Sequence, residues 1–153
     1  MQSPKIYLFF LKEFVKGKEA KKDFRSKARK LVKGILENEE VRCSSINLIF
    51  CSDETIKEYN EKYLSHDYET DVITFYDKDE NNEIESEIFI SVDSVKNNAK
   101  RYKTDFQNEL KRVMIHGVLH LCGFKDKTRP DKIRMRKREN YYLNISAKKS
   151  RRH

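Results

Sequence analysis

The run MIHGVLHLCGFKDKTRPD (residues 114–131) contains two of the chain's four histidines, His116 and His120, four residues apart. Four residues of an α-helix turn through roughly 400°, so both imidazoles would lie on one face, about 6 Å apart, and could bind one metal ion. Gly123 can end this helix and let the chain reverse, which would bring Asp126 within reach as a third ligand. The pattern H-x3-H-x5-D leaves the fourth position of a tetrahedral ion for water, as in catalytic sites. The alternative is two ordinary histidines on a buried helix.

The residue after the first histidine limits this chemistry. Zinc peptidases with an HExxH motif place a glutamate base there, whereas this chain has Gly117, so a peptidase would lack its base. A glycine inside a helix costs about 1 kcal/mol relative to alanine. Its presence therefore favours a close approach of another backbone or of a substrate at this turn.

The composition predicts one globular domain in a reducing compartment. The 153 residues are 37% hydrophobic and 38% charged, and 9 Phe and 8 Tyr supply bulky side chains for a core. Three cysteines without a CxxC spacing argue against a disulfide framework and against a zinc ribbon. We find no stretch of about 18 apolar residues and no signal-peptide pattern, and we expect a cytoplasmic protein that does not enter a membrane.

Basic residues are concentrated at the C-terminal end. Residues 125–153 contain twelve Lys or Arg against three acidic residues, a surplus of nine that accounts for the net charge of +8 of the whole chain. Such a concentration favours a polyanionic partner, most simply nucleic acid. A solvated helix face followed by a frayed tail is the alternative.

The elements that must position the histidines follow from hydrophobic periodicity. Alternating apolar residues predict strands, as at Ile46, Leu48 and Phe50, and apolar residues at helical spacing predict amphipathic helices. Strands are expected at 5–11, 44–52, 71–77 and 87–93, the last two as a hairpin, and helices at 21–40, 53–64, 94–102, 105–123 and 130–145. The predicted fold class is α+β, a small sheet with surrounding helices and a long central helix that carries the histidines. A single domain over residues 1–145 would end in a basic tail at 146–153.

Several segments resemble one protein family. The run HGVLHLCGFKD is similar to the signature HGxLHLxGxDH of the YbeY family, which consists of metal-dependent single-strand endoribonucleases that act in rRNA maturation and ribosome quality control. The segment YNEKYLSHDYETDVITF (59–75) resembles the family's LNxxYRxxxxxTDVLSF block, SEIFISVDSVKNNA (86–99) resembles its GDIxIs block, and Met135 with Glu139 resembles its M-x-x-x-E. The likeness covers roughly residues 45–142. The family fold, a small mixed β-sheet surrounded by helices, agrees with the predicted elements.

The resemblance implies that His116 and His120 are the first two ligands of one zinc ion. The family's third ligand is a histidine ten residues after the first, a position held here by Asp126, and the aspartate that usually precedes it is Lys125. A carboxylate is a competent zinc ligand, but it makes the ion a weaker Lewis acid, and a set of two histidines and one carboxylate admits other divalent metals. Alternatively, Asp126 is a turn residue between two lysines.

The implied reaction is hydrolysis of RNA phosphodiesters by a metal-activated water, with the general base unassigned. Asp71 matches the aspartate of the family's TDV block and would either orient a metal-bound histidine or cap its strand. Five basic residues are expected to hold the backbone of rRNA or ribosome-associated RNA, although some of them must face solvent or form ion pairs, because the run exceeds one helical face. These are Arg129, Arg134, Arg136, Lys137 and Arg138.

One departure from the family bears on catalysis. The family has an arginine after the tyrosine of its YR pair, thought to help handle phosphate, whereas Tyr63 is followed by Leu64. His66 either supplies a donor in its place or lies in an exposed loop. The competing hypothesis is therefore a non-catalytic RNA-binding or ribosome assembly factor with a structural metal, in which Cys122 could be a fourth ligand. The helical spacing instead places Cys122 in the core.

Overall fold

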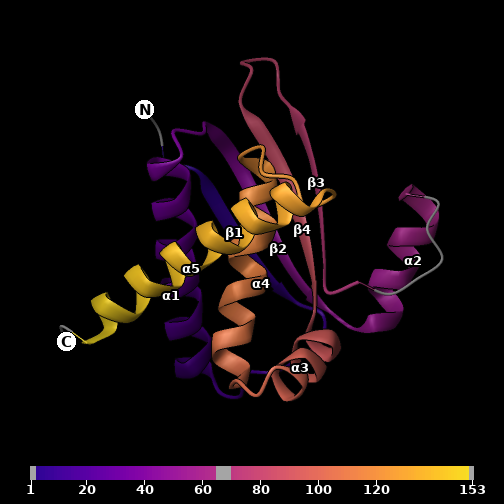
Figure 1. Cartoon of the computed structure of the whole chain (residues 1–153), viewed down its shortest axis with the longest axis vertical. Helices are drawn as coiled ribbons and strands as arrows, with labels where there is room; N and C mark the ends of the chain where they lie inside the picture. Colours follow the sequence, from indigo (N-terminus) through magenta and orange to yellow (C-terminus); the bar gives the residue numbers. More distant parts are fainter. Residues whose placement is uncertain (1–2, 65–69, 152–153) are drawn as a thin grey trace.

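The computed structural model describes residues 3–64 and 70–151, in which four strands and five helices are found. In chain order these are β1 (Lys5–Phe10), α1 (Lys18–Asn38), β2 (Cys43–Cys51), α2 (Asp53–Leu64), β3 (Val72–Lys78), β4 (Ile84–Ser91), α3 (Val92–Arg101), α4 (Phe106–Leu121) and α5 (Arg129–Arg151) (Figure 1). His66, considered above as a phosphate donor, lies outside the described residues. Among the residues that are described, no helix is both long and apolar enough to cross a membrane.

The strands form one mixed sheet in the order β1-β2-β4-β3. Strand β2 pairs in parallel with β1 and with β4, and β3 pairs antiparallel with β4. The predicted hairpin of β3 and β4 is confirmed. Its turn is shorter than the segment left between the predicted strands, because the Asp79 side chain accepts hydrogen bonds from the N–H groups of Asn81 (2.9 Å) and Glu83 (3.0 Å). The sheet and its helices confirm the α+β class, and β3 is left as an edge strand.

Helix α4 occupies the centre of the molecule. It packs against β3, β4, α1, α3 and α5, and its residues from Leu110 to Leu121 contribute to the larger of two hydrophobic clusters. In Figure 1, α1 and α4 lie in front of the sheet, α5 crosses over α4, and α2 lies to the right beyond β3 and β4. The smaller cluster, which contains Ile49, Ile56 and Phe89, joins α2 to the sheet. The predicted central helix that carries the histidines is therefore confirmed.

Both ends of α4 are set by local sequence. Asp105 caps its N-terminus, where the carboxylate accepts a hydrogen bond from the N–H of Asn108 at 2.7 Å. At the other end, Gly123 adopts φ +94°, its N–H donates to His120 O, and the N–H of Phe124 donates to Leu119 O, both at 3.1 Å. These two bonds form a Schellman motif, in which a glycine readily takes the left-handed conformation. The predicted stop at Gly123 is confirmed.

Helix α5 is longer than the periodicity predicts. It runs to Arg151 instead of ending at Ile145, since the residues after Ile145 include neither glycine nor proline to stop it. Residues 146–151, expected as the start of a basic tail, are the last turns of this helix. Its inward face buries Met135, Glu139 and Tyr142.

Gly117 lies where α4 comes closest to the sheet. A Cβ atom built on this residue would lie 2.8 Å from Cγ2 of Ile88 on β4 and 3.1 Å from Cγ2 of Val72 on β3. Thr74 of β3 also donates a hydrogen bond from Oγ1 to the Gly117 carbonyl oxygen at 3.0 Å. The close approach expected at this glycine is therefore made by side chains of the protein's own sheet.

Substitution Gly117→Ala should lower the free energy of unfolding by about 1–3 kcal/mol, because the added methyl group forces the packed Ile88 to shift. This loss would outweigh the gain of about 1 kcal/mol in helix propensity. Gly34→Ala is the matched control, since Gly34 also lies inside a helix but has no atom within 4 Å of the added Cβ. Urea unfolding should show the control more stable than the wild type and Gly117→Ala less stable; equal gains in both would contradict the packing argument.

Candidate metal centre and active site

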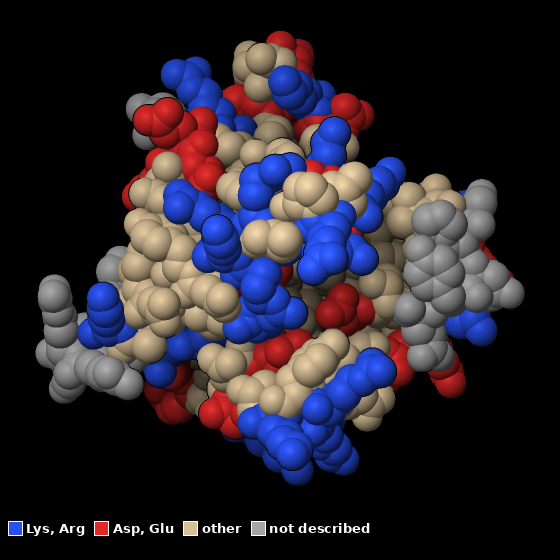
Figure 2. Space-filling model, viewed as in Figure 1, with Lys and Arg blue, Asp and Glu red and all other residues tan. Residues whose placement is uncertain are grey.

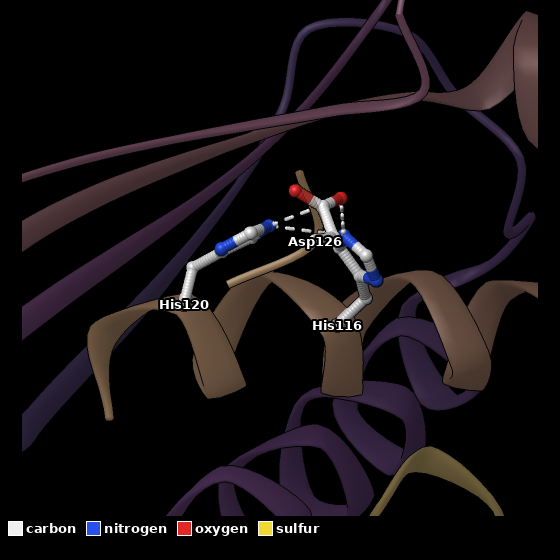
Figure 3. A group of neighbouring side chains, drawn as sticks. All are labelled: His116, His120 and Asp126. Carbon is white, nitrogen blue, oxygen red and sulfur yellow. Dashed lines mark hydrogen bonds and ion pairs between the residues drawn. The ribbon is translucent and has the colours of Figure 1, made fainter. Parts of the chain in front are cut away.

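Three side chains converge beyond the C-terminal half of α4. Nε2 of His116 lies 3.0 Å from Nε2 of His120 and 3.2 Å from Oδ2 of Asp126, and Nε2 of His120 lies 3.7 Å from the same oxygen (Figure 3). The histidines come from adjacent turns of α4, and Asp126 comes from the loop that follows the Schellman motif. Within the described residues, this is the one group of three or more potential metal-ligating side chains in such proximity.

The spacing of these atoms fits a metal ion. Ligand atoms at about 2.0–2.1 Å from a tetrahedral ion lie about 3.3 Å from one another. The three distances observed here, 3.0, 3.2 and 3.7 Å, bracket that value. Three protein ligands with nitrogen and oxygen donors are the set typical of a catalytic site, in which one position is left for water or substrate.

Each histidine is oriented by a hydrogen bond from its other ring nitrogen. Nδ1 of His120 donates to the Phe124 carbonyl oxygen at 3.0 Å, and Nδ1 of His116 donates to Oε2 of Glu139 at 2.7 Å. With the proton on Nδ1, Nε2 of each ring carries the lone pair that a metal requires. Burial and the neighbouring His116 lower the pKa of His120, which favours its neutral form.

Glu139 is the centre of a buried charged network. Its side chain is 5% exposed and, besides His116, it pairs with Nη1 of Arg112 at 3.0 Å. Burial alone would raise the pKa of Glu139, but the hydrogen bond from His116, the charge of His116 and the hydrogen bond from Arg112 outweigh it and lower the pKa. Burial alone would lower the pKa of His116, but the hydrogen bond to Glu139 and the charge of Glu139 outweigh it, so the pKa of this histidine is raised. The sequence had pointed to Glu139 as a family position but not to this contact.

A cavity of about 280 Å³ opens beside His116 and Asp126. Helices α4 and α5 contribute most of its lining, and the end of α3, Asp71 and Asp126 contribute the rest. Its lining residues are Asp71, Asn98, Tyr102, Glu109, Arg112, Val113, His116, Asp126, Lys132, Met135, Arg136 and Glu139. Figure 2 shows Lys and Arg side chains gathered over α5, with acidic side chains set deeper in the hollow beneath.

Asp71 lies in this cavity but contacts a different partner from the one expected. Its carboxylate accepts a hydrogen bond from Nδ2 of Asn98 at 3.2 Å, and its backbone carbonyl accepts one from the N–H of Ser91. Burial raises the pKa of Asp71, while the nearby His116 opposes the shift. The bond to the His116 ring that was considered for Asp71 is made by Glu139.

The five basic residues of α5 that were expected to hold RNA have different surroundings. Arg136 lines the cavity, and Arg129 and Lys137 are exposed. Arg134 pairs with Asp131 at 2.6 Å, and Arg138 pairs at 2.7 Å with Glu39, the C-cap residue of α1, while lying over the Tyr141 ring. Arg138 thus joins α5 to α1. Lys132, which was not singled out from the sequence, lines the cavity.

Cys122 packs against the hydrophobic core, as the helical spacing predicts, and burial raises the pKa of its thiol to about 12. A thiol that resists deprotonation is a poor metal ligand. Leu64, at the position of the family's arginine, is 42% exposed at the end of α2.

Comparison with known proteins shows the family to which the chain belongs. The model of the family described as endoribonuclease YbeY matches residues 12–147. An endoribonuclease YbeY from Parabacteroides distasonis is 46% identical over 114 residues, 74% of this chain and 80% of the relative, and one from Christiangramia forsetii is 40% identical over 139 residues, 91% and 92% of the two chains. The solution structure of a Thermotoga maritima protein superposes with a TM-score of 0.60 at 27% identity, covering 95% of this chain and 91% of the other. The chain therefore belongs to the YbeY family of endoribonucleases, a family involved in rRNA maturation.

Proposed function

We propose that this protein is a zinc-dependent endoribonuclease that hydrolyses phosphodiester bonds in single-stranded rRNA or ribosome-associated RNA. The observation that carries the proposal is the convergence of His116 Nε2, His120 Nε2 and Asp126 Oδ2 at distances that suit one ion, beside an open cavity. His116, His120 and Asp126 would hold the metal. When bound there, a divalent metal would polarise a phosphate oxygen and acidify a water molecule for attack on phosphorus.

The protein's own groups have separate tasks in this reaction. Glu139 and the Phe124 carbonyl hold the two imidazoles with Nε2 facing the ion. Arg136 and Lys132, on the cavity wall, would bind phosphates on either side of the cleaved bond through contacts that do not depend on sequence. They would take over the phosphate contact for which Leu64 has no suitable group.

The carboxylate of Asp126 affects which divalent metal the site would prefer. This carboxylate adds a negative charge that a third histidine would not, so an ion bound there would be a weaker Lewis acid, and harder divalent ions would compete better with zinc. The three cysteines are free thiols, which supports a reducing, cytoplasmic location.

Cleavage of a labelled single-stranded RNA should require the metal. We expect chelator-treated protein to be inactive, stoichiometric zinc to restore cleavage, and His120→Ala to lose at least about 100-fold in rate because only two ligands remain. The same RNA annealed to its complement is the control and should be cut far more slowly. Manganese and magnesium should be compared with zinc in the same assay.

The competing function predicts a different result. If zinc-loaded protein binds the single strand tightly but leaves it intact with every divalent metal tested, the chain is an RNA-binding or ribosome assembly factor with a structural metal. Added zinc should raise the unfolding temperature in either case, since an ion that binds at 100 times its Kd stabilises the folded state by about 2.7 kcal/mol.

A further inference from the structure

Glu109 is a buried carboxylate with no partner in the reaction described above. It lies in the first turn of α4 and is 4% exposed, and within residues 3–64 and 70–151 its carboxylate makes no hydrogen bond or ion pair. The neighbouring Arg112 does not fill this role, because its guanidinium is engaged by Glu139 and Asn140, both at 3.0 Å. The Glu109 carboxylate therefore has acceptor oxygens that no described residue uses, and they are available to a ligand.

The Glu109 carboxylate faces the cavity beside the metal ligands. The residue lines that cavity, and in the described structure every polar side-chain atom that is fully sealed from solvent has a partner. The unpaired oxygens of Glu109 therefore open into the cavity space. Burial raises the pKa of Glu109, although Arg112 partly opposes the shift.

A second metal ion is the weaker account of this site. The cavity also contains the carboxylates of Asp71 and Glu139, but the described residues include one potential metal-ligating group, and it is His116 with His120 and Asp126. Glu139 is fully engaged, and Asp71 accepts from Asn98. Of these three carboxylates, Glu109 is the one whose oxygens no described residue engages.

An aromatic ring lines the same cavity. Tyr102 follows α3, is 60% exposed and lines the same cavity as Glu109 and His116. Exposed aromatic rings at RNA-binding sites stack on unpaired bases, while polar groups alongside read the Watson–Crick edge of the base. A stacking ring, a buried acceptor and flanking cations together are the components of a nucleobase site.

We propose that this cavity is a nucleobase subsite in which Tyr102 stacks on a base next to the cleaved phosphate and Glu109 accepts hydrogen bonds from its Watson–Crick edge. The proposal rests on the proposed function, since it places the base of the RNA substrate. Two carboxylate oxygens match the adjacent N1–H and N2–H donors of guanine. Adenine and cytosine offer one amino group on that edge, and uracil offers a single N–H flanked by carbonyl oxygens that a carboxylate repels. The subsite therefore selects guanine.

The test is binding of short oligonucleotides with a 2′-O-methyl backbone, which the enzyme cannot cut through 2′-OH chemistry and whose integrity is checked after each titration. One carries a single central guanosine in a uridine background, and the other carries inosine, which lacks only the N2 amino group. We expect the guanosine strand to bind about tenfold more tightly, because inosine leaves one carboxylate oxygen without a donor and a bidentate contact discriminates bases by roughly 5- to 150-fold. Glu109→Gln should bring the guanosine strand to the affinity of the inosine strand.

Variants of Tyr102 test the proposed stacking on a base. Tyr102→Ala should weaken both strands about tenfold while keeping their ratio, and Tyr102→Phe should restore binding, because stacking does not need the hydroxyl. Tyr7→Ala is the matched control: this tyrosine is 48% exposed on β1 and does not line the cavity. Metal content and unfolding temperature of each variant establish that the fold and the metal site are intact.

Equal binding of the two strands by the wild type, an unchanged preference in Glu109→Gln, or no binding of either strand would each overturn the subsite. None of these results tests the proposed endoribonuclease function, which is tested separately by zinc-dependent cleavage of unmodified RNA. Conversely, guanosine preference in a protein that never cleaves RNA would support the proposed nucleobase subsite and contradict the proposed nuclease activity.

Discussion

Asp126→Ala should deprive the protein of its metal. The substitution leaves two imidazoles whose Nε2 atoms lie 3.0 Å apart and removes the oxygen that lies 3.2 and 3.7 Å from them. Since altering a residue that merely orients a ligand already costs about 10–100-fold in metal affinity, loss of a ligand itself should cost at least about 100-fold. Metal content after dialysis and competition with a chromophoric chelator measure the change. Asp126→His, which restores the family's usual ligand, should keep zinc and favour it more strongly over manganese.

Asp131→Ala is the control for this experiment. Asp131 lies five residues after Asp126, in the first turn of α5, where it exchanges 3.2 Å hydrogen bonds with Thr128 just before the helix. Its loss should cost about 1 kcal/mol of stability through the helix cap and leave metal binding unchanged. A full complement of metal in Asp126→Ala would instead mean that Asp126 is the turn residue between Lys125 and Lys127, and that the third ligand lies elsewhere.

Glu139→Ala should damage both stability and metal affinity. It leaves the Arg112 guanidinium without its buried partner, at a cost of about 3 kcal/mol, and it frees the His116 ring to rotate, with a loss of about 10–100-fold in metal affinity. Urea unfolding of metal-free protein and zinc titration measure the two effects separately.

The two effects can be uncoupled by a second substitution. In Arg112→Ala/Glu139→Ala the unpaired charge is gone, so part of the lost stability should return, but zinc affinity should stay low because His116 still lacks its acceptor. If the double variant regains zinc affinity along with stability, the contact between Glu139 and His116 is not what positions the ring.

The part of the site that could be predicted from sequence is the part that is local in sequence. His116 and His120 share a helical face, and the Schellman motif at Gly123 reverses the chain within three residues and brings Asp126 back to them. Glu139 could not be placed in this way. It reaches His116 across 23 residues, and that contact depends on the angle at which α5 crosses α4, which no periodicity encodes.

The same limit applies to the fold and to the basic helix. Each strand and helix could be predicted from its hydrophobic pattern, but the order β1-β2-β4-β3 depends on pairings between distant segments. Arg138 could not be told apart from its basic neighbours, because its partner Glu39 lies 99 residues away, at the C-terminal cap of α1. The end of α5 was placed too early, since amphipathicity faded before any residue that stops a helix appeared.

The shortness of the ligand loop has a consequence for folding. All three proposed ligands lie within residues 116–126, whereas the parallel pairing of β2 with β4 joins residues such as Leu48 and Ile88 that are far apart in the chain. Contacts at short range form before those at long range, because closing a small loop costs less entropy. A chain with α4 and its turn in place can therefore capture the ion while the sheet is still unpaired, and zinc should speed folding as well as slow unfolding.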